Sequence, residues 1–463
     1  MADAADRSNT ISEDIAGFIT GFDLDHAPDA AIGLSQVAFL DTIGVMLAGS
    51  REPAARIVCD VAAAEGAAQV ATVVGSTVRT SPGNAALVNG TATQALDYDL
   101  SFMIGQSTAA LIPALLPQAE CNDATPRQVI ASYIVGVEIC ARLAKCFPTL
   151  SSEGGWHGAG VLGTVAAAAA LAKLTNQPAR VIPAIIGISA SMASGVSANF
   201  GTMTKPLHAG LAARNGALAV SLGEKGFTGS AAALEGPHGF FSSLAQGLAW
   251  DTGGFDDLGQ RFYLIDPGYK IKPFACGGLL HCSIEAALKL RGQAQPQIAD
   301  ISRIKIGVSQ HAKNRAIDRY PWSEDSSRFS LRYLVAYALI HGAPRLSAFR
   351  EEAFADDQVR ALSERCEIVL DDEFATLTGS GYSPGRVTIS FGDAERIEHA
   401  VYVPTGTRKT PMGADQIKEK FMACATRVLS DQGAWQLYDY LRGFSTHPTL
   451  GDLWPMIAAS DGD

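Results

Sequence analysis

The sequence predicts a mainly α-helical protein, with a large all-α domain and a smaller α+β domain. Three observations support this class: Ala-rich helical patterns run to about residue 265, alternating strand patterns follow, and helical patterns resume from Gly413. Of the 463 residues, 47% are hydrophobic and 18% are charged. This low charge content excludes a disordered chain and predicts a large core, with further surface buried between subunits.

Three helices are predicted in the first half, over Ser35–Ser50, Pro126–Phe147 and Val161–Leu174. The second begins with proline, which suits the first turn of a helix. The third is almost entirely alanine and has no polar face, so we expect other helices to enclose it. We place the N-terminal part of the helical domain at residues 1–267.

The pattern changes after residue 267. Arg303–Val308 and Arg386–Phe391 alternate polar and β-branched residues, as half-buried strands do, and Ile397–Val403 is predicted to return as the second strand of a hairpin. We place this α+β domain at residues 268–410 and the returning C-terminal helices at 411–463. Helices are predicted at Ser283–Arg291, Ser330–His341, Asp357–Glu364, Ile417–Leu429 and Ala434–Leu441.

The charge and cysteine content narrow the partners and the compartment. The net charge of −11 repels phosphate backbones, so we expect no nucleic-acid partner. The eight cysteines lack metal-binding spacing, and the N-terminus is acidic and polar, which predicts free thiols in a cytoplasmic protein. Two uncharged stretches, Leu100–Ala119 and Val181–Thr204, are interrupted by polar residues, glycine or proline, so we interpret them as buried core and expect no membrane span.

The first candidate functional block is Ala95–Ser101, which holds Asp97, Tyr98 and Asp99 ahead of an uncharged segment. Burial there would raise the pKa of a carboxylate toward the range of a general base. The alternative is that Asp97 or Asp99 caps the following helix.

The second block is GGWHGAG, in which glycines flank His157 before the alanine-rich helix. Glycines let backbone and ligand approach closely, and a histidine transfers protons near neutral pH. The alternative is a structural histidine that is hydrogen-bonded in a tight turn.

The third block contains Lys205, which ends a long uncharged run, and His208 three residues later. A lone cation in such a run needs an anion, which is either a bound ligand or a structural ion-pair partner. His208 shares the helical face of Lys205 if a helix begins near Pro206.

A fourth block holds Lys270 and Lys272 on alternate positions at the predicted domain junction, where clefts form. A solvated basic surface is the alternative. The segment Arg328–Tyr333 is a predicted helix start that by itself indicates no function.

Sequence signatures for nucleotide, nicotinamide, zinc-protease and α/β-hydrolase sites are missing. Asp, His, Lys and Tyr without a cofactor signature suit proton abstraction next to a carboxylate.

Several ordered motifs span nearly the whole chain, namely NGTATQALDYD, GGWHGAGVLG, TMTKPLHAGLAARNG, IKPFACGG and RFSLRY. Together they resemble the motifs of the MmgE/PrpD family, which includes 2-methylcitrate dehydratase, cis-aconitate decarboxylase and iminodisuccinate epimerase. The resemblance implies a large helical domain with an α+β lid, assembled as a homodimer, with no metal or organic cofactor.

The resemblance also implies which residues form the site. By motif it assigns catalytic roles to Asp97, His157, Lys205 and Lys272, and we expect substrate contacts from Ser101, Gln106, Thr204, His208 and Tyr333. The chain departs from the family pattern at two positions, because Leu100 replaces a second acid and Gln106 stands in the place of a histidine. Gln106 can donate and accept hydrogen bonds, but it cannot titrate.

These observations predict a cofactor-independent lyase, either a dehydratase or a decarboxylase, acting on a small di- or tricarboxylate such as 2-methylcitrate or cis-aconitate. One alternative is an epimerase or racemase of a dicarboxylate such as iminodisuccinate. Another is a catalytically inactive homologue that binds a carboxylate, which the missing histidine motivates.

Overall fold

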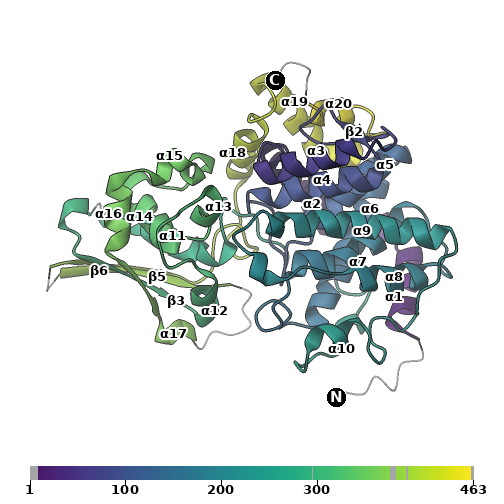
Figure 1. Cartoon of the computed structure of the whole chain (residues 1–463), viewed down its shortest axis with the longest axis horizontal. Coiled ribbons are helices and arrows are strands. Elements are labelled where there is room, and N and C mark those ends of the chain that lie inside the picture. Colours follow the sequence, from purple (N-terminus) through teal and green to yellow (C-terminus); the bar gives the residue numbers. More distant parts are fainter. Residues whose placement is uncertain (1–8, 295, 376–381, 393–394, 460–463) are drawn as a thin grey trace. The chain divides into compact units, whose positions relative to one another are not determined.

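The computed structural model describes residues 9–294, 296–375, 382–392 and 395–459. Helices dominate it, which confirms the predicted mainly α class (Figure 1). The chain forms two compact units. The helical unit comprises the chain up to Tyr269 and again from Gly413, and the sheet unit runs from Lys270 to Met412.

Within its described residues, the helical unit contains ten α-helices before the chain leaves it and three after the chain returns. The first ten are α1 (Ile11–Gly21), α2 (Asp29–Gly49), α3 (Pro53–Ala64), α4 (Pro82–Ala95), α5 (Thr108–Cys121), α6 (Pro126–Cys146), α7 (Gly158–Leu174), α8 (Ile182–Met192), α9 (Thr204–Glu224) and α10 (Phe240–Ala245). The last three are α18 (Ala414–Ala425), α19 (Asp431–Arg442) and α20 (Leu453–Ile457).

Helix α7 lies at the centre of the helical unit, as its lack of a polar face predicts. Every residue of α7 except Lys173 is buried, and it packs against α5, α6, α8 and α9. Small residues set these close distances: a Cβ atom added at Gly216 of α9 would lie 2.7 Å from the Ala167 Cβ atom. Helices α4 and α9 cross in the same way, because a Cβ atom at Gly90 would lie 2.7 Å from the Gly210 Cα atom.

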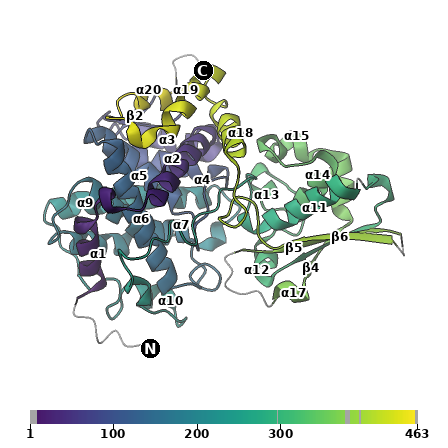
Figure 2. The ribbon, with the colours of Figure 1, turned by 180° about the vertical axis from the view of Figure 1, so that it is seen from behind.

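Helix α2 is long and apolar enough to span a membrane, but 67% of its most apolar window is buried inside the structure. It packs against α4, α6, α18 and α19. Figure 2 shows the yellow C-terminal helices α18 and α19 beside the purple α2. The packing is that of a core helix, and it joins the first and last parts of the chain in one unit.

The expectation that the first half is purely helical is wrong at one place. Strands β1 (Ala71–Thr72) and β2 (Arg79–Thr80) form an antiparallel ribbon in which Ala71 lies opposite Thr80. Strands of two residues are too short to leave an alternating pattern in the sequence. All eight cysteines are free thiols, and six of them are buried.

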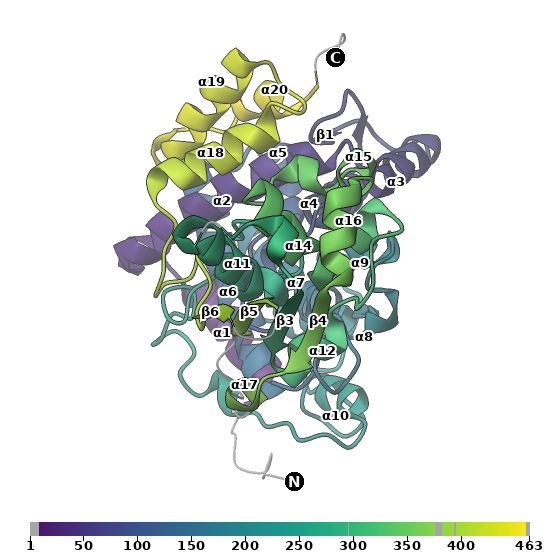
Figure 3. The ribbon, with the colours of Figure 1, turned by 90° about the vertical axis from the view of Figure 1, so that its left-hand side faces the viewer.

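The sheet unit contains a four-stranded sheet in the order β4-β3-β5-β6 (Figure 3). Strand β3 pairs parallel with β4 and antiparallel with β5, which in turn pairs antiparallel with β6. The sequence predicted β3, β5 and β6 but missed β4, a five-residue edge strand. The bounds are β3 (Arg303–Val308), β4 (Cys366–Leu370), β5 (Gly385–Phe391) and β6 (Glu395–Val401).

Three helices, α11, α14 and α16, pack on one face of this sheet (Figures 1 and 3). Alternate residues of β5 are buried beneath them, which explains the alternation seen in the sequence. The helices of this unit are α11 (His281–Ala294), α12 (Gln310–Arg315), α13 (Glu324–Ser327), α14 (Leu331–His341), α15 (Glu351–Phe354), α16 (Asp357–Glu364) and α17 (Asp372–Ala375).

Candidate active site

Asp97 lies in the turn that follows α4, and its backbone is left-handed with φ of 48°. This conformation costs a residue other than glycine about 1 kcal/mol or more, and it persists where the surroundings determine it. The Asp97 side chain is buried. The capping alternative is wrong for both acids of this turn, because α5 begins only at Thr108 and its N-cap residue is Ser107.

Lys205 supplies the cation beside Asp97. It lies in the first turn of α9, where the helix dipole disfavours a positive charge. Its Nζ atom lies 2.7 Å from Asp97 Oδ1, and both side chains are less than a tenth exposed. The ion pair that the sequence left open as an alternative is therefore present, and it joins two helices through residues that are 108 positions apart.

Gln106 connects this ion pair to α4. Its Nε2 atom donates to Asp97 Oδ1 at 2.8 Å, and its Oε1 atom accepts from Gln94 Nε2 at 3.0 Å. A longer contact of 3.4 Å joins Gln106 Nε2 to Asp99 Oδ1. Two donors, Lys205 and Gln106, thus stabilise negative charge on one oxygen of Asp97.

His157 and His208 form a buried imidazole pair. Their Nδ1 atoms lie 3.1 Å apart, so one nitrogen donates and the other accepts. Burial, together with the nearby Lys205, lowers the pKa of His208 below its ordinary value. A neutral His208 can accept this hydrogen bond from Nδ1–H of His157, or donate it, depending on which nitrogen of each ring carries the proton.

Glycines explain how the backbone surrounds these histidines. His157 precedes α7, and its N–H donates to the Gly195 carbonyl at 2.8 Å. Gly195 has φ of 129°, and a Cβ atom there would lie 3.2 Å from the His208 ring. A Cβ atom at Gly158 would lie 2.3 Å from the Ile104 carbonyl oxygen. The glycines that flank His157 in the sequence therefore serve close approach of the backbone.

Phe200 links the imidazole pair to the ion pair. Its ring meets the His157 ring edge to face, with centroids 4.9 Å apart, and the Lys205 Nζ atom lies 5.7 Å from its centroid. The helical unit therefore brings Asp97, Gln106, His157, Lys205 and His208 into one site. It combines a carboxylate, an ammonium group and an imidazole pair, which suffices for anion binding and proton transfer.

Two other predicted residues of this unit lie beside these groups in the chain. Ser101 begins a small loop in which Phe102 and Gly105 exchange two backbone hydrogen bonds. Thr204 is the first residue of α9, and its N–H donates to Thr202 Oγ1 at 3.2 Å. Their substrate contacts stay predictions.

The sheet unit holds Lys270 and Lys272, the two lysines of the fourth sequence block. Lys272 is only 1% exposed, so the alternative of a solvated basic surface is wrong for it. Lys270 donates to the Gly278 carbonyl at 3.0 Å, and burial with the neighbouring Lys272 lowers the pKa of Lys270 to about 8. Between them, the Ile271 N–H donates to the Gly406 carbonyl at 2.9 Å. The catalytic role of Lys272 stays a prediction.

Tyr333 lies in the core of the sheet unit. It is fully buried, its hydroxyl donates to the Ala348 carbonyl, and its ring meets Tyr320 edge to face. Burial raises the pKa of Tyr333 far above its ordinary value. This environment is that of a packing residue, and the predicted substrate contact of Tyr333 stays untested.

Sequence reasoning missed Gln94 and Phe200 as parts of the site. Gln94 is 1% exposed, and its signal was weak because α4 holds further buried uncharged polar residues, such as Asn89 and Thr93. Phe200 gave no signal, because an aromatic residue in an apolar run is usually core.

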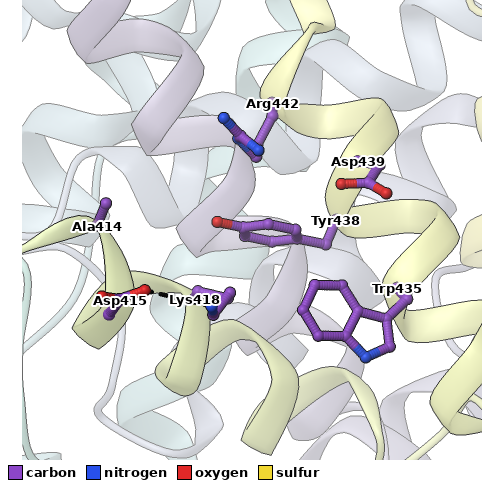
Figure 4. Close-up of a pocket in the computed structure, with 7 residues that line it drawn as sticks. All are labelled: Ala414, Asp415, Lys418, Trp435, Tyr438, Asp439 and Arg442. Carbon is purple, nitrogen blue, oxygen red and sulfur yellow. Dashed lines mark hydrogen bonds and ion pairs between the residues drawn. The ribbon is translucent and has the colours of Figure 1, made fainter.

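A surface pocket of about 300 Å³ lies elsewhere in the helical unit, between α18 and α19 (Figure 4). Trp435 and Tyr438 form its aromatic wall, and Lys418 pairs with Asp415 at its edge (Figure 4). It lacks a histidine, and we assign it no chemistry. Among the described residues, no three His, Cys, Asp or Glu side chains gather as a metal site.

Comparison with known proteins identifies the class to which this fold and site belong. Residues 13–252 match the MmgE/PrpD N-terminal domain, and residues 274–439 match the MmgE/PrpD C-terminal domain. The chain belongs to the MmgE/PrpD family.

Several curated relatives match most of the chain at low identity. The chain is 26% identical to a cis-aconitate decarboxylase-like protein, oryM, of Aspergillus oryzae, over 99% of each chain. It is also 26% identical to cis-aconitate decarboxylase of Aspergillus terreus, over 98% of this chain and 96% of the relative. The identity to cis-aconitate decarboxylase of Homo sapiens is 26%, over 91% of this chain and 89% of the relative.

Proposed function

We propose that this chain is a lyase that decarboxylates a small tricarboxylate of the cis-aconitate type. The observation that carries the proposal is the buried Asp97–Lys205 ion pair beside the His157–His208 pair. Relatives described as cis-aconitate decarboxylases, which match nearly the whole chain, support the choice of reaction.

Lys205 is the proposed anchor for a substrate carboxylate. A buried ammonium group interacts more strongly with an anion than a solvated one does, because the local dielectric is low. A bound carboxylate would share Lys205 with Asp97. Lys272 is a second proposed carboxylate ligand, a role that the family resemblance implies for a cation that is itself buried.

The reaction balances with one proton. In such a substrate, one carboxylate sits on a methylene group next to the carbon–carbon double bond. The bond between that carboxylate and the methylene breaks, CO₂ leaves, and the electron pair forms a new double bond to the neighbouring carbon. The original double-bond electrons move to the carbon beside a second carboxylate, as an enolate-like anion. A proton delivered there completes the product.

His157 is the proposed proton donor. With its Nδ1–H donating to neutral His208, His157 would have to be an imidazolium that also carries a proton on Nε2, and transfer of that Nε2 proton would leave His157 neutral. Lys205 would stabilise the enolate-like charge as it develops. Gln106, which occupies the position of a family histidine, donates a hydrogen bond to Asp97, so we assign it the orientation of that carboxylate and no proton transfer.

The test is an NMR time course in D₂O, with cis-aconitate, 2-methylcitrate, citrate and iminodisuccinate supplied separately. Decarboxylation predicts CO₂ and a product that carries one deuterium per turnover. If His157 is the donor, His157→Gln should abolish formation of the product, because any product made in D₂O takes up a deuteron whichever group delivers it.

Other outcomes would contradict the proposal in distinct ways. An alkene formed without CO₂ would indicate a dehydratase. Deuterium entering a substrate without new carbon signals would indicate the epimerase. No change in any of the four compounds would favour the inactive carboxylate-binding homologue.

A further inference from the structure

Another buried ion pair of the helical unit contacts the turn that carries Asp97. Lys420 of α18 places its Nζ atom 2.7 Å from Asp41 Oδ1 of α2, and both side chains are at most 3% exposed. This pair joins the C-terminal helices to an N-terminal helix within the helical unit. Burying two charges costs desolvation free energy, so the further contacts of Lys420 indicate what the buried ion pair stabilises.

The Lys420 ammonium group also holds the turn that carries Asp97. Its Nζ atom donates to the Tyr98 carbonyl at 2.9 Å and lies 4.1 Å from the centroid of the Tyr98 ring. Tyr98 is the residue between the two acids of the turn. One cation therefore fixes both the backbone and the side chain at the middle of the turn.

The turn needs such support because Asp97 is in the left-handed conformation. Lys205 and Gln106 hold its side chain, and Lys420 holds the carbonyl of the next residue. An ion pair that only fastened α18 to α2 would need Asp41 and Lys420 alone. The additional hydrogen bond to Tyr98 connects that pair to the candidate active site.

We propose that Lys420 is a positioning residue. Its hydrogen bond to the Tyr98 carbonyl keeps the turn in the conformation that directs the Asp97 carboxylate toward Lys205. The inference deepens the proposed function and rests on it for any effect on turnover. It gives the C-terminal segment a part in the site, although Lys420 lies 323 positions after Asp97 in the chain.

The first test compares Lys420→Met with Lys418→Met by hydrogen exchange and mass spectrometry. Lys418 is the matched control, because it lies on the same helix and its ammonium pairs with exposed Asp415 at 3.2 Å. In Lys420→Met, the hydrogen-bonded amides of Asp97, Phe102 and Gly105 should exchange about tenfold faster or more. Lys418→Met should leave them unchanged.

The second readout is turnover of cis-aconitate. A misplaced carboxylate predicts a fall in kcat of about 10- to 100-fold for Lys420→Met, with a smaller change in KM. Lys420→Arg keeps the charge and a donor, so it should restore part of both the protection and kcat. Unchanged exchange at the three amides in Lys420→Met would overturn the proposal.

A double variant keeps the test decisive if Lys420→Met does not fold. Asp41→Asn combined with Lys420→Met removes both charges, and buried pairs replaced together are often tolerated. Because the donor to Tyr98 is still lost, we expect fast exchange in the turn and low kcat. If this variant kept the exchange rates and kcat of the wild type, the pair would only stabilise the packing of α18 on α2, and the proposal would be wrong.

The two proposals fail separately. A wild-type protein that turns over none of the four carboxylates removes the proposed function. The exchange measurement then still decides whether Lys420 holds the Asp97 turn.

Discussion

Two buried acid–base pairs in the helical unit show how similar chemistry serves different ends. Glu138 and Arg142 lie one turn apart on α6, with 2.7 Å between Oε2 and Nη1. Glu138 accepts from the N–H groups of Tyr263 and Leu264, and Arg142 donates to the carbonyls of Asp257 and Arg261. Main-chain groups thus surround this pair, which fixes the path of the 257–264 segment.

The Asp97–Lys205 pair has different surroundings. Its partners come from the turn after α4 and from α9, and the groups around it are side chains: Gln106, Phe200 and the imidazoles of His157 and His208. A pair held by main-chain groups stabilises a fold, whereas a pair beside titratable side chains can serve a reaction. The comparison therefore separates a structural ion pair from a candidate catalytic one.

The largest expected effect comes from Lys205→Met. Loss of the ammonium group removes the proposed carboxylate anchor and the stabilisation of the developing charge, so turnover of cis-aconitate should fall by about 1,000-fold or more. The variant leaves Asp97 buried without its cation, so we expect a protein that is less stable than the wild type but, because the hydrogen bond from Gln106 is kept, still folded by circular dichroism. A rate near that of the wild type would remove Lys205 from the mechanism.

Arg142→Met is the matched variant in the other pair. It leaves Glu138 buried without its cation, so the free energy of unfolding should fall by about 3–5 kcal/mol in urea titrations. The molecules that stay folded should keep nearly the wild-type kcat. A selective loss of kcat without loss of stability would contradict the structural role assigned to this pair.

A smaller effect is expected where α4, which precedes the Asp97 turn, crosses α9, which carries Lys205. A Cβ atom at Gly210 of α9 would lie 2.2 Å from the Leu87 carbonyl oxygen and 2.5 Å from Thr91 Oγ1. Gly210→Ala should therefore push α9 away from α4, cost about 1–3 kcal/mol of stability and lower kcat about tenfold. The Glu138–Arg142 pair, within one helix, has no such dependence on helix crossing.

Gly33→Ala is the control for this substitution. Gly33 lies in helix α2 with no atom of another residue near its absent Cβ, so alanine there should leave kcat unchanged and raise stability by up to about 1 kcal/mol. Equal kcat in both glycine variants would show that the helix crossing does not set the geometry of the site.

The smallest expected effect is a pH dependence of stability that arises at the candidate active site. Burial and Lys205 lower the pKa of His208 below 6.5, so the unfolded chain takes up a proton there before the folded protein does. The stability associated with neutral His208 is complete above about pH 6.5 and is lost as pH falls through the lowered folded-state pKa.

Urea unfolding at pH 7.5 and pH 5.5 measures this dependence. His208→Gln should lose less stability on acidification than the wild type, because it has no imidazole to protonate. His26→Gln, which removes an exposed histidine of the same unit, should behave like the wild type. If His208→Gln and the wild type lost the same free energy of unfolding between pH 7.5 and pH 5.5, protonation of His208 would not cause the loss.

Local patterns predicted the helices and strands with the clearest periodicity. Strand β3 and helix α16 have the predicted bounds, and α6 differs by one residue at its end. The prediction failed where local signal is weak, as in the two-residue strands β1 and β2 and the edge strand β4. For the site, the sequence indicated Asp97, His157 and Lys205, because each is a titratable residue within a stretch of apolar or glycine residues. A charged or polar side chain is buried in such a stretch only when it has a partner or a ligand.

The order of residues is enough to predict the mainly helical class, the enclosed α7 and the inventory of acid, base and cation. The pairing of Lys205 with Asp97, the contact of His157 with His208, the hydrogen bond from Gln106 to Asp97 and the reach of Lys420 to the same turn come from the folded arrangement of the helices. The physical reason is range. Periodicity and capping act over a few residues, whereas these contacts join residues from 9 to 322 positions apart, and packing of the helices sets their geometry.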